Sequence, residues 1–228
     1  MDNIQLYCLN YSQRLEEKDF QQCLSDLPVP IQLEIKAYKH WESAQASLLG
    51  KMLLSYAFKH MDIPFSVHQL QLTEKDRPYI EGNIDFNISH SGEYVMLAVS
   101  QSAKVGIDIE KHRQLDYLLF RKYFSDNEWA LIEAADNKIT AFFDFWAIKE
   151  SAIKCDGRGV EVLSKTQVDY NEGISLGVKY SDKIYCDGRL LFFQPLNVNV
   201  HYSCCVSSNQ MINVDLHHLT IQDLLKSK

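Results

Sequence analysis

The sequence predicts an α+β fold built from two lobes of similar size, and two observations favour it. In each half of the chain, helical segments are set against short apolar runs that read as strands. Near the middle, the short polar link QSAKV at 101–105 separates two of these apolar runs. We therefore expect an N-terminal lobe over residues 1–103 and a C-terminal lobe over residues 104–228.

The first half opens with a strand-like run over 1–10, in which Ile4, Leu6 and Cys8 alternate with other residues. A helical stretch follows and ends near Pro28. A long helix is predicted over 41–60, because small and apolar residues recur there at helical spacing. Three strand-like runs come next: FSVHQLQL at 65–72, FNISH at 86–90 and YVMLAVS at 94–100. The last run is apolar on both faces, which is typical of a central strand.

The second half begins with the strand-like run VGIDIE at 105–110. Helices are predicted over 114–123, from Ser125 onward, and over 137–155. Ser125 and Glu128 have the spacing of a capping box, and Gly157 suits the end of the long helix. Residues 160 to 208 are mostly strand-like, in four runs: VLSKTQVDY, ISLGVKY, RLLFFQPL and VNVHYSCCVS.

Composition excludes several classes of protein. The 228 residues are 46% hydrophobic and carry a net charge of −7, which allows a normal core and argues against a strongly basic nucleic-acid binder. No apolar stretch reaches the roughly 18 residues of a membrane-spanning helix, and the first residues lack the pattern of a secretory signal. The six cysteines are scattered without a CxxC pair. We therefore expect a cytoplasmic protein with reduced cysteines, not associated with membranes.

The predicted strand VGIDIE carries two carboxylates, Asp108 and Glu110, only two residues apart. Because side chains alternate along a strand, Gly106, Asp108 and Glu110 share one face, with the two acids about 6.7 Å apart. Two carboxylates at this distance repel each other unless water or a cation lies beside them. The pair is either a solvated strand face or part of a site for Mg²⁺, which prefers oxygen ligands.

A third carboxylate lies on the predicted helix over 137–155. At 100° per residue, Glu150 falls in the middle of an apolar stripe, whose members are Ile139, Phe142, Phe143, Trp146 and Ile153. A carboxylate among aromatic rings needs a cation, and Lys154 lies one helical turn further on. Either these two residues form a half-exposed helix pair, or Glu150 is a third metal ligand and Lys154 faces a phosphate.

The segment RPYIEGNIDFNISHSGEYV carries groups that suit phosphate oxygens. Ser89 and His90 precede Gly92 in a predicted turn, where hydroxyls, an imidazole and free backbone amides come together. Arg77, further upstream, offers a planar donor fork. The alternative is an ordinary polar hairpin turn.

Taken together, FNISHSG, GIDIE and FWAIKESAIK resemble the 4′-phosphopantetheinyl transferases of the larger, surfactin-synthetase-activator type. The resemblance is dense from about Pro78 to Gly159. It implies two lobes related by a pseudo-twofold axis, with coenzyme A and Mg²⁺ (Mn²⁺ is the alternative) bound in the cleft between them. The enzymes of this family move phosphopantetheine from coenzyme A to a serine of a carrier protein and release adenosine 3′,5′-bisphosphate.

The resemblance also implies roles for single residues. The metal ligands would be Asp108, Glu110 and Glu150. Glu150 and Lys154 would be catalytic. The residues in contact with coenzyme A would be Arg77, Ser89, His90, Lys149 and Lys154. Gly106, which has no side chain on the acidic face, would leave room for the pyrophosphate.

One departure from the family pattern concerns the coenzyme's 3′-phosphate. Relatives often carry arginines just before S-L-L-G, whereas this chain has Ala44 and Ala46 in the run SAQASLLGK. Four basic residues are candidates to compensate: Lys36, Lys39, His40 and Lys51.

The expected partner is an acidic acyl, peptidyl or aryl carrier protein. The stretch KHRQLDYLLFRKYF mixes basic and apolar residues, among them Arg121 and Lys122, and such a surface suits an acidic helix. The alternative is a normal amphipathic helix with solvated charges. The length suggests a monomer that forms its own cleft. Two other functions stay open: a non-catalytic relative that binds coenzyme A or a carrier, and another Mg²⁺-dependent phosphotransferase.

Overall fold

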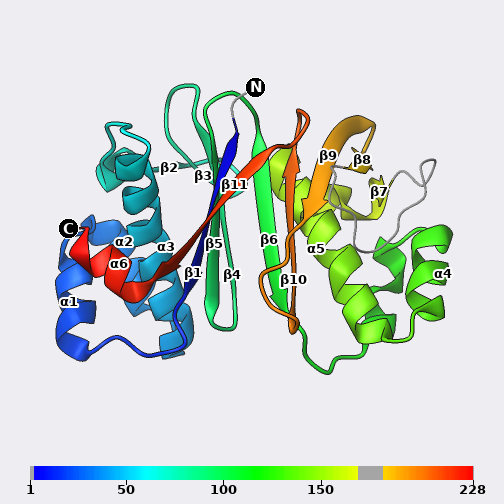
Figure 1. Ribbon diagram of the computed structural model, residues 1–228, viewed down its shortest axis with the longest axis horizontal. Helices are drawn as coiled ribbons and strands as arrows, with labels where there is room; N and C mark the ends of the chain where they lie inside the picture. The colour runs from blue at the N-terminus through cyan, green and yellow to red at the C-terminus, as the bar shows by residue number, and fades with distance from the viewer. Residues whose placement is uncertain (1–2, 169–181, 228) are drawn as a thin grey trace.

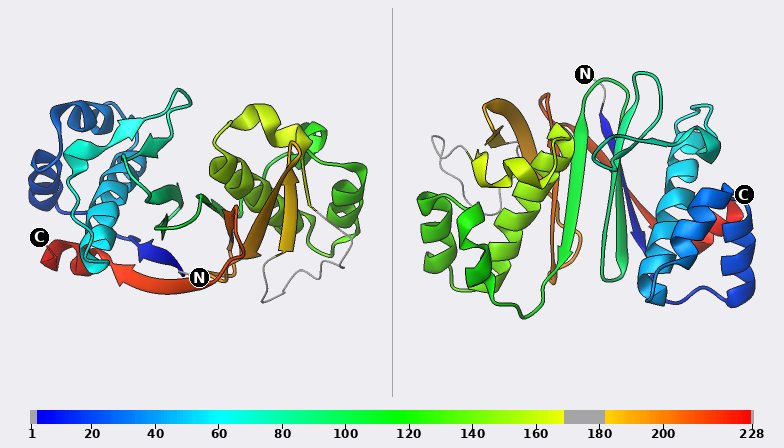
Figure 2. Two further views of the ribbon diagram at one scale, coloured as in Figure 1. Left: turned by 90° about the horizontal axis from the view of Figure 1, so that it is seen from above. Right: turned by 180° about the vertical axis from the view of Figure 1, so that it is seen from behind.

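The computed structural model describes residues 3–168 and 182–227, in which two large β-sheets are each backed by helices (Figure 1). This arrangement confirms the α+β class. The predicted strand ISLGVKY and the end of VLSKTQVDY lie outside the described residues. Helices form the outer layers and strands lie between them, and the views from above and from behind agree on this (Figure 2).

The sheet of the N-terminal lobe has the strand order β11-β1-β5-β4. Its strands are β1 (Ile4–Asn10), β4 (Asp85–Ser91), β5 (Tyr94–Ser100) and β11 (Val214–Thr220). The central strand β5 is buried along its whole length, as its apolar sequence predicts. A separate two-stranded ribbon pairs β2 (Gln71–Leu72) with β3 (Pro78–Tyr79).

The helices of this lobe are α1 (Glu17–Ser25), α2 (Val29–Lys36), α3 (Trp41–His60) and α6 (Ile221–Lys226). The long helix α3 buries Leu48, Leu49 and Leu53 against the sheet, which confirms the predicted helix over 41–60. Helix α2 was not predicted from the sequence, because prolines flank its start. Pro30 lies in the first turn, where the missing N–H group costs nothing.

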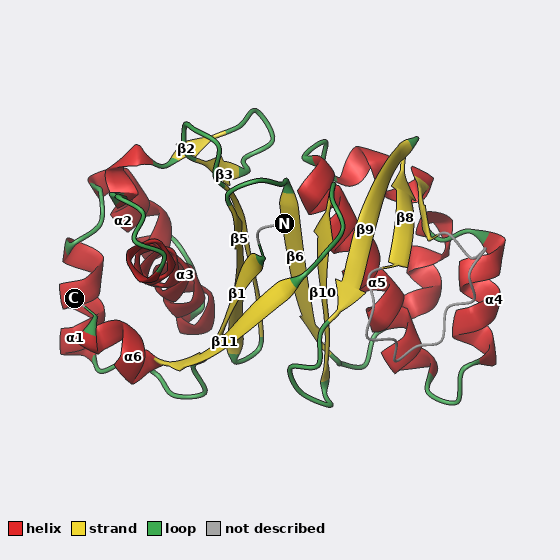
Figure 3. Cartoon of the chain, turned by 45° about the horizontal axis from the view of Figure 1, so that its top comes forward, coloured by secondary structure: helices red, strands yellow, loops and turns green. Residues whose placement is uncertain are grey.

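The sheet of the C-terminal lobe has the order β6-β10-β9-β8-β7. Its strands are β6 (Val105–Lys111), β7 (Thr166–Val168), β8 (Asp182–Cys186), β9 (Arg189–Pro195) and β10 (Tyr202–Ser208). Two helices cover it, α4 (Asp126–Ala134) and α5 (Lys138–Asp156). Figure 3 shows α5 running along the sheet, with α4 at the outer end of the lobe.

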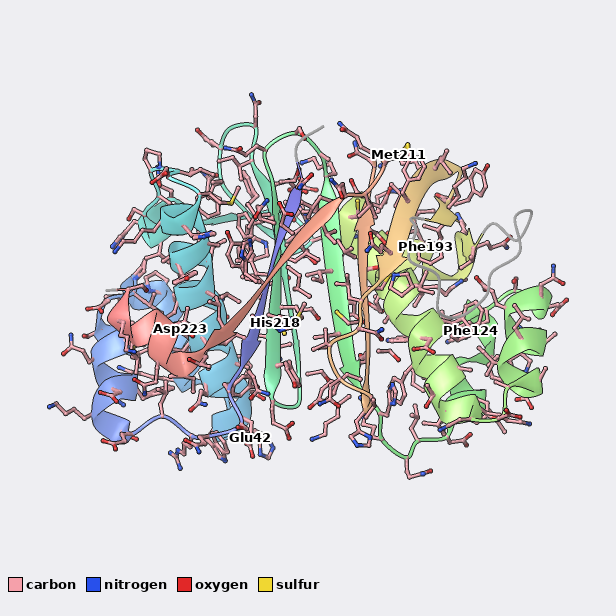
Figure 4. All side chains as sticks on the ribbon, viewed as in Figure 1. Glu42, Phe124, Phe193, Met211, His218 and Asp223 are labelled. Atoms are coloured by element: carbon pink, nitrogen blue, oxygen red, sulfur yellow. The ribbon has the colours of Figure 1, made fainter. Side chains whose placement is uncertain are left out.

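The predicted helix caps of this lobe are confirmed. Ser125 and Glu128 form a capping box at the start of α4. Gly157 ends α5 in the left-handed conformation, with φ of 83°. Phe124, which comes just before the N-terminus of α4, packs against aromatic side chains of α5 (Figure 4).

Three predicted elements form short 3₁₀ turns instead. The first is η1 (Val67–Gln69), in the run expected to be a strand over 65–72. The second is η2 (Tyr117–Tyr123), in the helix expected over 114–123. The third is η3 (Val160–Lys165), which precedes the three-residue strand β7.

The end of the chain returns to the N-terminal lobe, so residues beyond the expected boundary at 103–104 also contribute to that lobe. Strand β11 pairs in parallel with β1, from Ile4 opposite Val214 to Asn10 opposite Thr220. It thereby carries α6 back onto the helices of the N-terminal lobe. Figure 4 shows this return: Met211 lies beside the C-terminal sheet, and Asp223 lies on the opposite lobe. The pairing partner of β11 lies about two hundred residues away in the sequence, which no local pattern reveals.

The two sheets meet along their edge strands, with β4 beside β6 (Figure 1). A third apolar cluster, distinct from the cores of the two lobes, fills the space between the sheets. It includes Leu6 of β1, Met96 of β5 and Ile107 of β6, all fully buried. Within the described ranges, none of the helices has the length and apolar character needed to cross a membrane.

Candidate active site

A pocket of about 410 Å³ opens where β4, β6 and α5 come together. Its lining residues are Ile88, Ser89, His90, Asp108, Ile109, Glu110, Trp146, Glu150 and Lys154. The structure thus brings six of the predicted site residues into one place. Two come from the N-terminal lobe and four from the C-terminal lobe, so the pocket lies at the junction of the lobes.

Asp108 is the centre of the hydrogen bonding in this pocket. Its Oδ1 accepts hydrogen bonds from Lys154 Nζ at 2.5 Å and from Ser89 Oγ at 2.9 Å. Lys154 Nζ also donates to Ser89 Oγ at 3.2 Å. One ammonium group therefore links the carboxylate of one lobe to the hydroxyl of the other.

The other two acids of the pocket lie close enough to influence each other. The pKa of Glu150 is raised to about 7: burial is the main cause, Lys154 opposes the shift, and the charges of Asp108 and Glu110 add to it. Burial and Asp108 likewise raise the pKa of Glu110, although Arg113 opposes the shift through a 3.0 Å hydrogen bond. The three acids outnumber the two cationic side chains, Lys154 and Arg113, that act on them.

The donor set suits a hard divalent cation. Asp108 Oδ2 is buried and has no hydrogen-bond partner among the described residues, which is costly for a carboxylate oxygen. A cation beside the three acids would satisfy that oxygen and relieve their repulsion. Among the described residues, however, no group of three or more acidic, histidine or cysteine side chains converges as a ready-made metal cluster. Lys154 and Ser89 bind the other oxygen of Asp108.

His90 faces the solvent side of the pocket. Desolvation lowers the pKa of its imidazole, and the charges of Lys154 and Lys51 lower it further. Lys51 lies on α3, next to Gly50, which packs against Ile88 of β4. Of the four basic residues proposed to compensate for Ala44 and Ala46, Lys51 is thus the one whose charge acts on His90. By contrast, Lys36 lines a separate pocket of about 210 Å³ beside Trp41.

The structure corrects the predicted role of Lys149. Its side chain is 0% exposed and faces the interior of the C-terminal lobe, away from the pocket. There Lys149 Nζ donates to Glu128 Oε2 at 3.0 Å and to the backbone oxygen of Thr166. Glu128 in turn accepts hydrogen bonds from the backbone N–H groups of Ser125 and Val168. The ion pair joins α4, α5 and β7 and leaves no ammonium for a coenzyme.

Replacing Lys149 with methionine should therefore affect stability first. The substitution leaves Glu128 as a buried, unpaired carboxylate, and we expect the free energy of unfolding to fall by about 3–5 kcal/mol. Chemical denaturation followed by circular dichroism measures this loss. The double variant Lys149→Met/Glu128→Gln removes both charges and should recover part of it. Equal destabilisation in both variants would contradict the account of a buried charge pair.

Arg77 lies apart from the junction pocket and is held by contacts within the protein. Its guanidinium forms a two-pronged ion pair with Asp85, at 2.8 and 2.9 Å, and donates to the backbone oxygen of Val105 at 2.9 Å. Arg77 does not line the pocket that holds Ser89 and His90; it borders a different one, of about 490 Å³. It ties the start of β6 to β4.

Gly106 is in close contact with α5 and does not border the pocket. A Cβ atom placed there would lie 2.1 Å from the carbonyl oxygen of Ser151 and 2.4 Å from the backbone nitrogen of Cys155. The prediction that Gly106 makes room for a pyrophosphate is wrong, since the helix backbone already occupies that space.

Three neighbours of the site were not predicted from the sequence: Ile88, Arg113 and Trp146. Trp146 was assigned to the core-facing stripe, and it does pack against Phe120 and Phe142. It lines the pocket as well because it lies one turn before Glu150. The spacing of three residues between Glu110 and Arg113 was the available signal for their ion pair.

Comparison with known proteins supports the resemblance to 4′-phosphopantetheinyl transferases over most of the chain. Residues 104–186 match the family model described as the 4′-phosphopantetheinyl transferase superfamily. Residues 14–102 match the model described as 4′-phosphopantetheinyl transferase, N-terminal. The two matched regions meet next to residues 103 and 104, where the sequence analysis placed the division between the lobes.

Curated relatives come from bacteria and from animals. The chain is 30% identical over 191 residues to the 4′-phosphopantetheinyl transferase gsp of Aneurinibacillus migulanus, covering 82% of this chain and 79% of the relative. It is 29% identical over 169 residues to 4′-phosphopantetheinyl transferase Sfp of Bacillus subtilis (strain 168), covering 70% and 73%. It is also 29% identical over 168 residues to the human L-aminoadipate-semialdehyde dehydrogenase-phosphopantetheinyl transferase, covering 64% and 54%. The sequence motifs, the two-lobed α+β fold and these similarities lead to one conclusion: the chain belongs to the 4′-phosphopantetheinyl transferase family of enzymes.

Proposed function

We propose that this enzyme transfers 4′-phosphopantetheine from coenzyme A to a serine of an apo carrier protein, with a divalent cation required. The serine oxygen forms a bond to the β-phosphorus of the coenzyme's pyrophosphate. The bond from that phosphorus to the bridging oxygen breaks, and adenosine 3′,5′-bisphosphate leaves. The observation that carries the proposal is the junction pocket, where three acids and Lys154 face Ser89 and His90.

The protein's own groups account for most of the proposed chemistry. In phosphoryl transfer, positioning and electrostatic stabilisation dominate the rate. Lys154, which is 29% exposed, would stabilise negative charge on the phosphoryl oxygens. Ser89 and His90 would bind coenzyme phosphates from the opposite lobe. Glu150 would accept the serine proton, directly or through a water molecule.

Mg²⁺, or Mn²⁺ in its place, would be held by Asp108, Glu110 and Glu150. Two observations support this assignment: Oδ2 of Asp108 is buried without a hydrogen-bond partner among the described residues, and the charges of the other two acids raise the pKa of Glu150. When bound, such an ion neutralises charge on the pyrophosphate.

Lys51 is proposed to hold the 3′-phosphate of coenzyme A together with His90. Burial lowers the pKa of Lys51, with Glu34 opposing the shift, so an anion next to this ammonium would be favourable. We expect Lys51→Ala to raise the KM for coenzyme A about tenfold, which corresponds to about 1.4 kcal/mol. With 3′-dephospho-coenzyme A, the KM values of the wild type and the variant should coincide.

The matched control for this prediction is Lys36→Ala, since Lys36 lines the separate pocket beside Trp41. Its KM for coenzyme A should stay at the wild-type value. If Lys51→Ala raises the KM by the same factor for coenzyme A and for 3′-dephospho-coenzyme A, Lys51 does not contact the 3′-phosphate.

The carrier protein is proposed to dock on η2, next to the pocket. Leu118 and Leu119 are 60% and 73% exposed, which suits an apolar contact with a helix of the partner. The basic group available there is Lys122, whose ammonium lies over the ring of Tyr123. Arg121 forms an ion pair with Asp126 and donates a hydrogen bond to the backbone oxygen of Phe124. It is therefore less suited than Lys122 to bind an acidic helix of the carrier.

Because both lobes of one chain line the pocket, we propose that the enzyme acts as a monomer.

Intact-mass spectrometry of the carrier tests the proposed function. The protein is mixed with coenzyme A, Mg²⁺ and apo carriers from fatty-acid, polyketide, nonribosomal-peptide and lysine pathways. At least one carrier should gain the mass of one phosphopantetheine group, and chelation of the metal should prevent the gain. If no carrier gains mass while a known transferase modifies the same samples, the proposal is wrong.

A further inference from the structure

The face of β4 that meets β6 is polar at every second residue, at Asp85, Asn87, Ser89 and Ser91. The first three of these side chains are buried. Polar groups buried on a strand are costly unless each is hydrogen bonded. Here the cost is offset because β6, the neighbouring strand, is the edge of the second sheet and presents unpaired backbone groups.

The four side chains accept hydrogen bonds from backbone N–H groups of β6, and we call this set the side-chain ladder. The rungs are Val105 N–H to Asp85 Oδ2 at 2.8 Å, Ile107 N–H to Asn87 Oδ1 at 2.9 Å, Ile109 N–H to Ser89 Oγ at 3.4 Å, and Lys111 N–H to Ser91 Oγ at 2.9 Å. Each rung joins residues that are 20 apart in the sequence. The two edge strands therefore lie side by side in one fixed register.

Two cationic side chains complete the junction by donating to carbonyl groups of β6. Arg77 donates to the backbone oxygen of Val105 at 2.9 Å, and Lys154 donates to that of Ile107 at 3.4 Å. Lys154 is also the partner of Asp108. Residue 107 is thus bonded through its N–H to Asn87 and through its carbonyl to the central ammonium of the pocket.

We propose that Asn87 and Ser91 are positioning residues, which set the register of β6 against β4 and so hold Asp108 and Lys154 opposite Ser89 and His90. Neither residue lines the pocket, so each acts through the strand it holds. The inference rests on the proposed function, because it concerns the alignment of the two halves of that site. This role also explains why the segment FNISHS carries the polar residues Asn87 and Ser91 in addition to Ser89 and His90, the two proposed to contact the coenzyme.

Paired substitutions at Asn87 test the inference. Asn87→Leu fills a similar volume but offers no acceptor to Ile107 N–H, whereas Asn87→Asp keeps the acceptor oxygen. Misplacement of catalytic groups by about 1 Å can cost 100-fold in rate, so we expect kcat of Asn87→Leu to fall roughly 10- to 100-fold. Asn87→Asp should recover most of this loss.

A second pair and a control separate positioning from general destabilisation. Ser91→Ala removes the rung to Lys111 at a partly exposed position that should not prevent folding, and Ser91→Thr keeps the hydroxyl. Thr166→Val removes a buried hydroxyl bonded to Val162 in the C-terminal lobe, away from the pocket. It should lower the melting temperature without changing kcat.

Hydrogen exchange of the peptide covering 105–111 provides a readout besides activity. Exchange should be faster in Asn87→Leu and Ser91→Ala, and unchanged in Asn87→Asp, Ser91→Thr and Thr166→Val. Transfer by the wild-type protein is verified first, so a failure of the proposed function is seen before any variant is compared. The inference is overturned if wild-type kcat persists in Asn87→Leu and Ser91→Ala, or if Thr166→Val lowers kcat and speeds this exchange as much as they do.

Discussion

Asp108→Asn should abolish transfer while the protein stays folded. Asparagine keeps the size of the side chain and an oxygen that can accept from Ser89, but it removes the negative charge that pairs with Lys154 and would bind the cation. Removing one group that stabilises charge in a transition state costs on the order of 10³ in kcat, and we expect a loss at least that large. Intact-mass analysis of the carrier measures the rate, and circular dichroism checks the fold.

The control for this prediction is Glu161→Gln, which removes an exposed carboxylate of the same lobe that pairs with Lys75 at the surface. Its transfer rate should match that of the wild type. If Asp108→Asn keeps a rate within a few-fold of the wild type, the pocket at the junction of the lobes is not the site of the chemistry.

Gly106→Ala should destabilise the whole C-terminal lobe. The added Cβ atom would meet the carbonyl oxygen of Ser151 at 2.1 Å, and backbone atoms of a buried helix have little freedom to move away. We expect the free energy of unfolding to fall by about 3 kcal/mol or more, at the upper end of the range for overpacked cores. Because α5 carries Glu150 and Lys154, the transfer rate of the remaining folded protein should fall as well.

Gly50→Ala is the matched control for this steric effect. Gly50 lies inside α3, and a Cβ atom there meets Ile88 at 3.4 Å, an ordinary contact. Replacing a glycine in a helix interior with alanine typically adds about 1 kcal/mol of helix stability. Chemical denaturation should therefore give a lower free energy of unfolding than the wild type for Gly106→Ala and a higher one for Gly50→Ala. A Gly106→Ala protein as stable as the wild type would contradict the close packing of α5 on β6.

Much of the site could be predicted from the sequence, because its residues follow local periodicities. Alternation along VGIDIE places Asp108 and Glu110 on one face, and helical spacing places Lys154 one turn after Glu150. Both patterns hold in the structure, and the pocket brings the four residues together with Ser89 and His90. The costly position of Glu150 on an apolar stripe was the strongest of these signals, and the raised pKa of its carboxyl agrees with it.

The residues that the structure places away from the pocket are fixed by contacts between distant segments. Lys149 has its partner in Glu128 on another helix, and Arg77 has one of its partners at the start of β6. Position 106 has no room for a side chain because the backbone of α5 packs directly against it. The sequence of a strand does not reveal which helix will pack on it. In each case the residue type suits a phosphate site, and only the tertiary packing decides whether that position borders the pocket.

Calorimetric titration of coenzyme A into the protein tests the claim that coenzyme A and a divalent cation bind together in the junction pocket. The wild type should bind coenzyme A tightly in Mg²⁺ and more weakly in a chelator. Asp108→Asn should show the weaker binding in both buffers. Equal affinity of the wild type and Asp108→Asn in Mg²⁺, with no effect of the chelator on either, would contradict the claim.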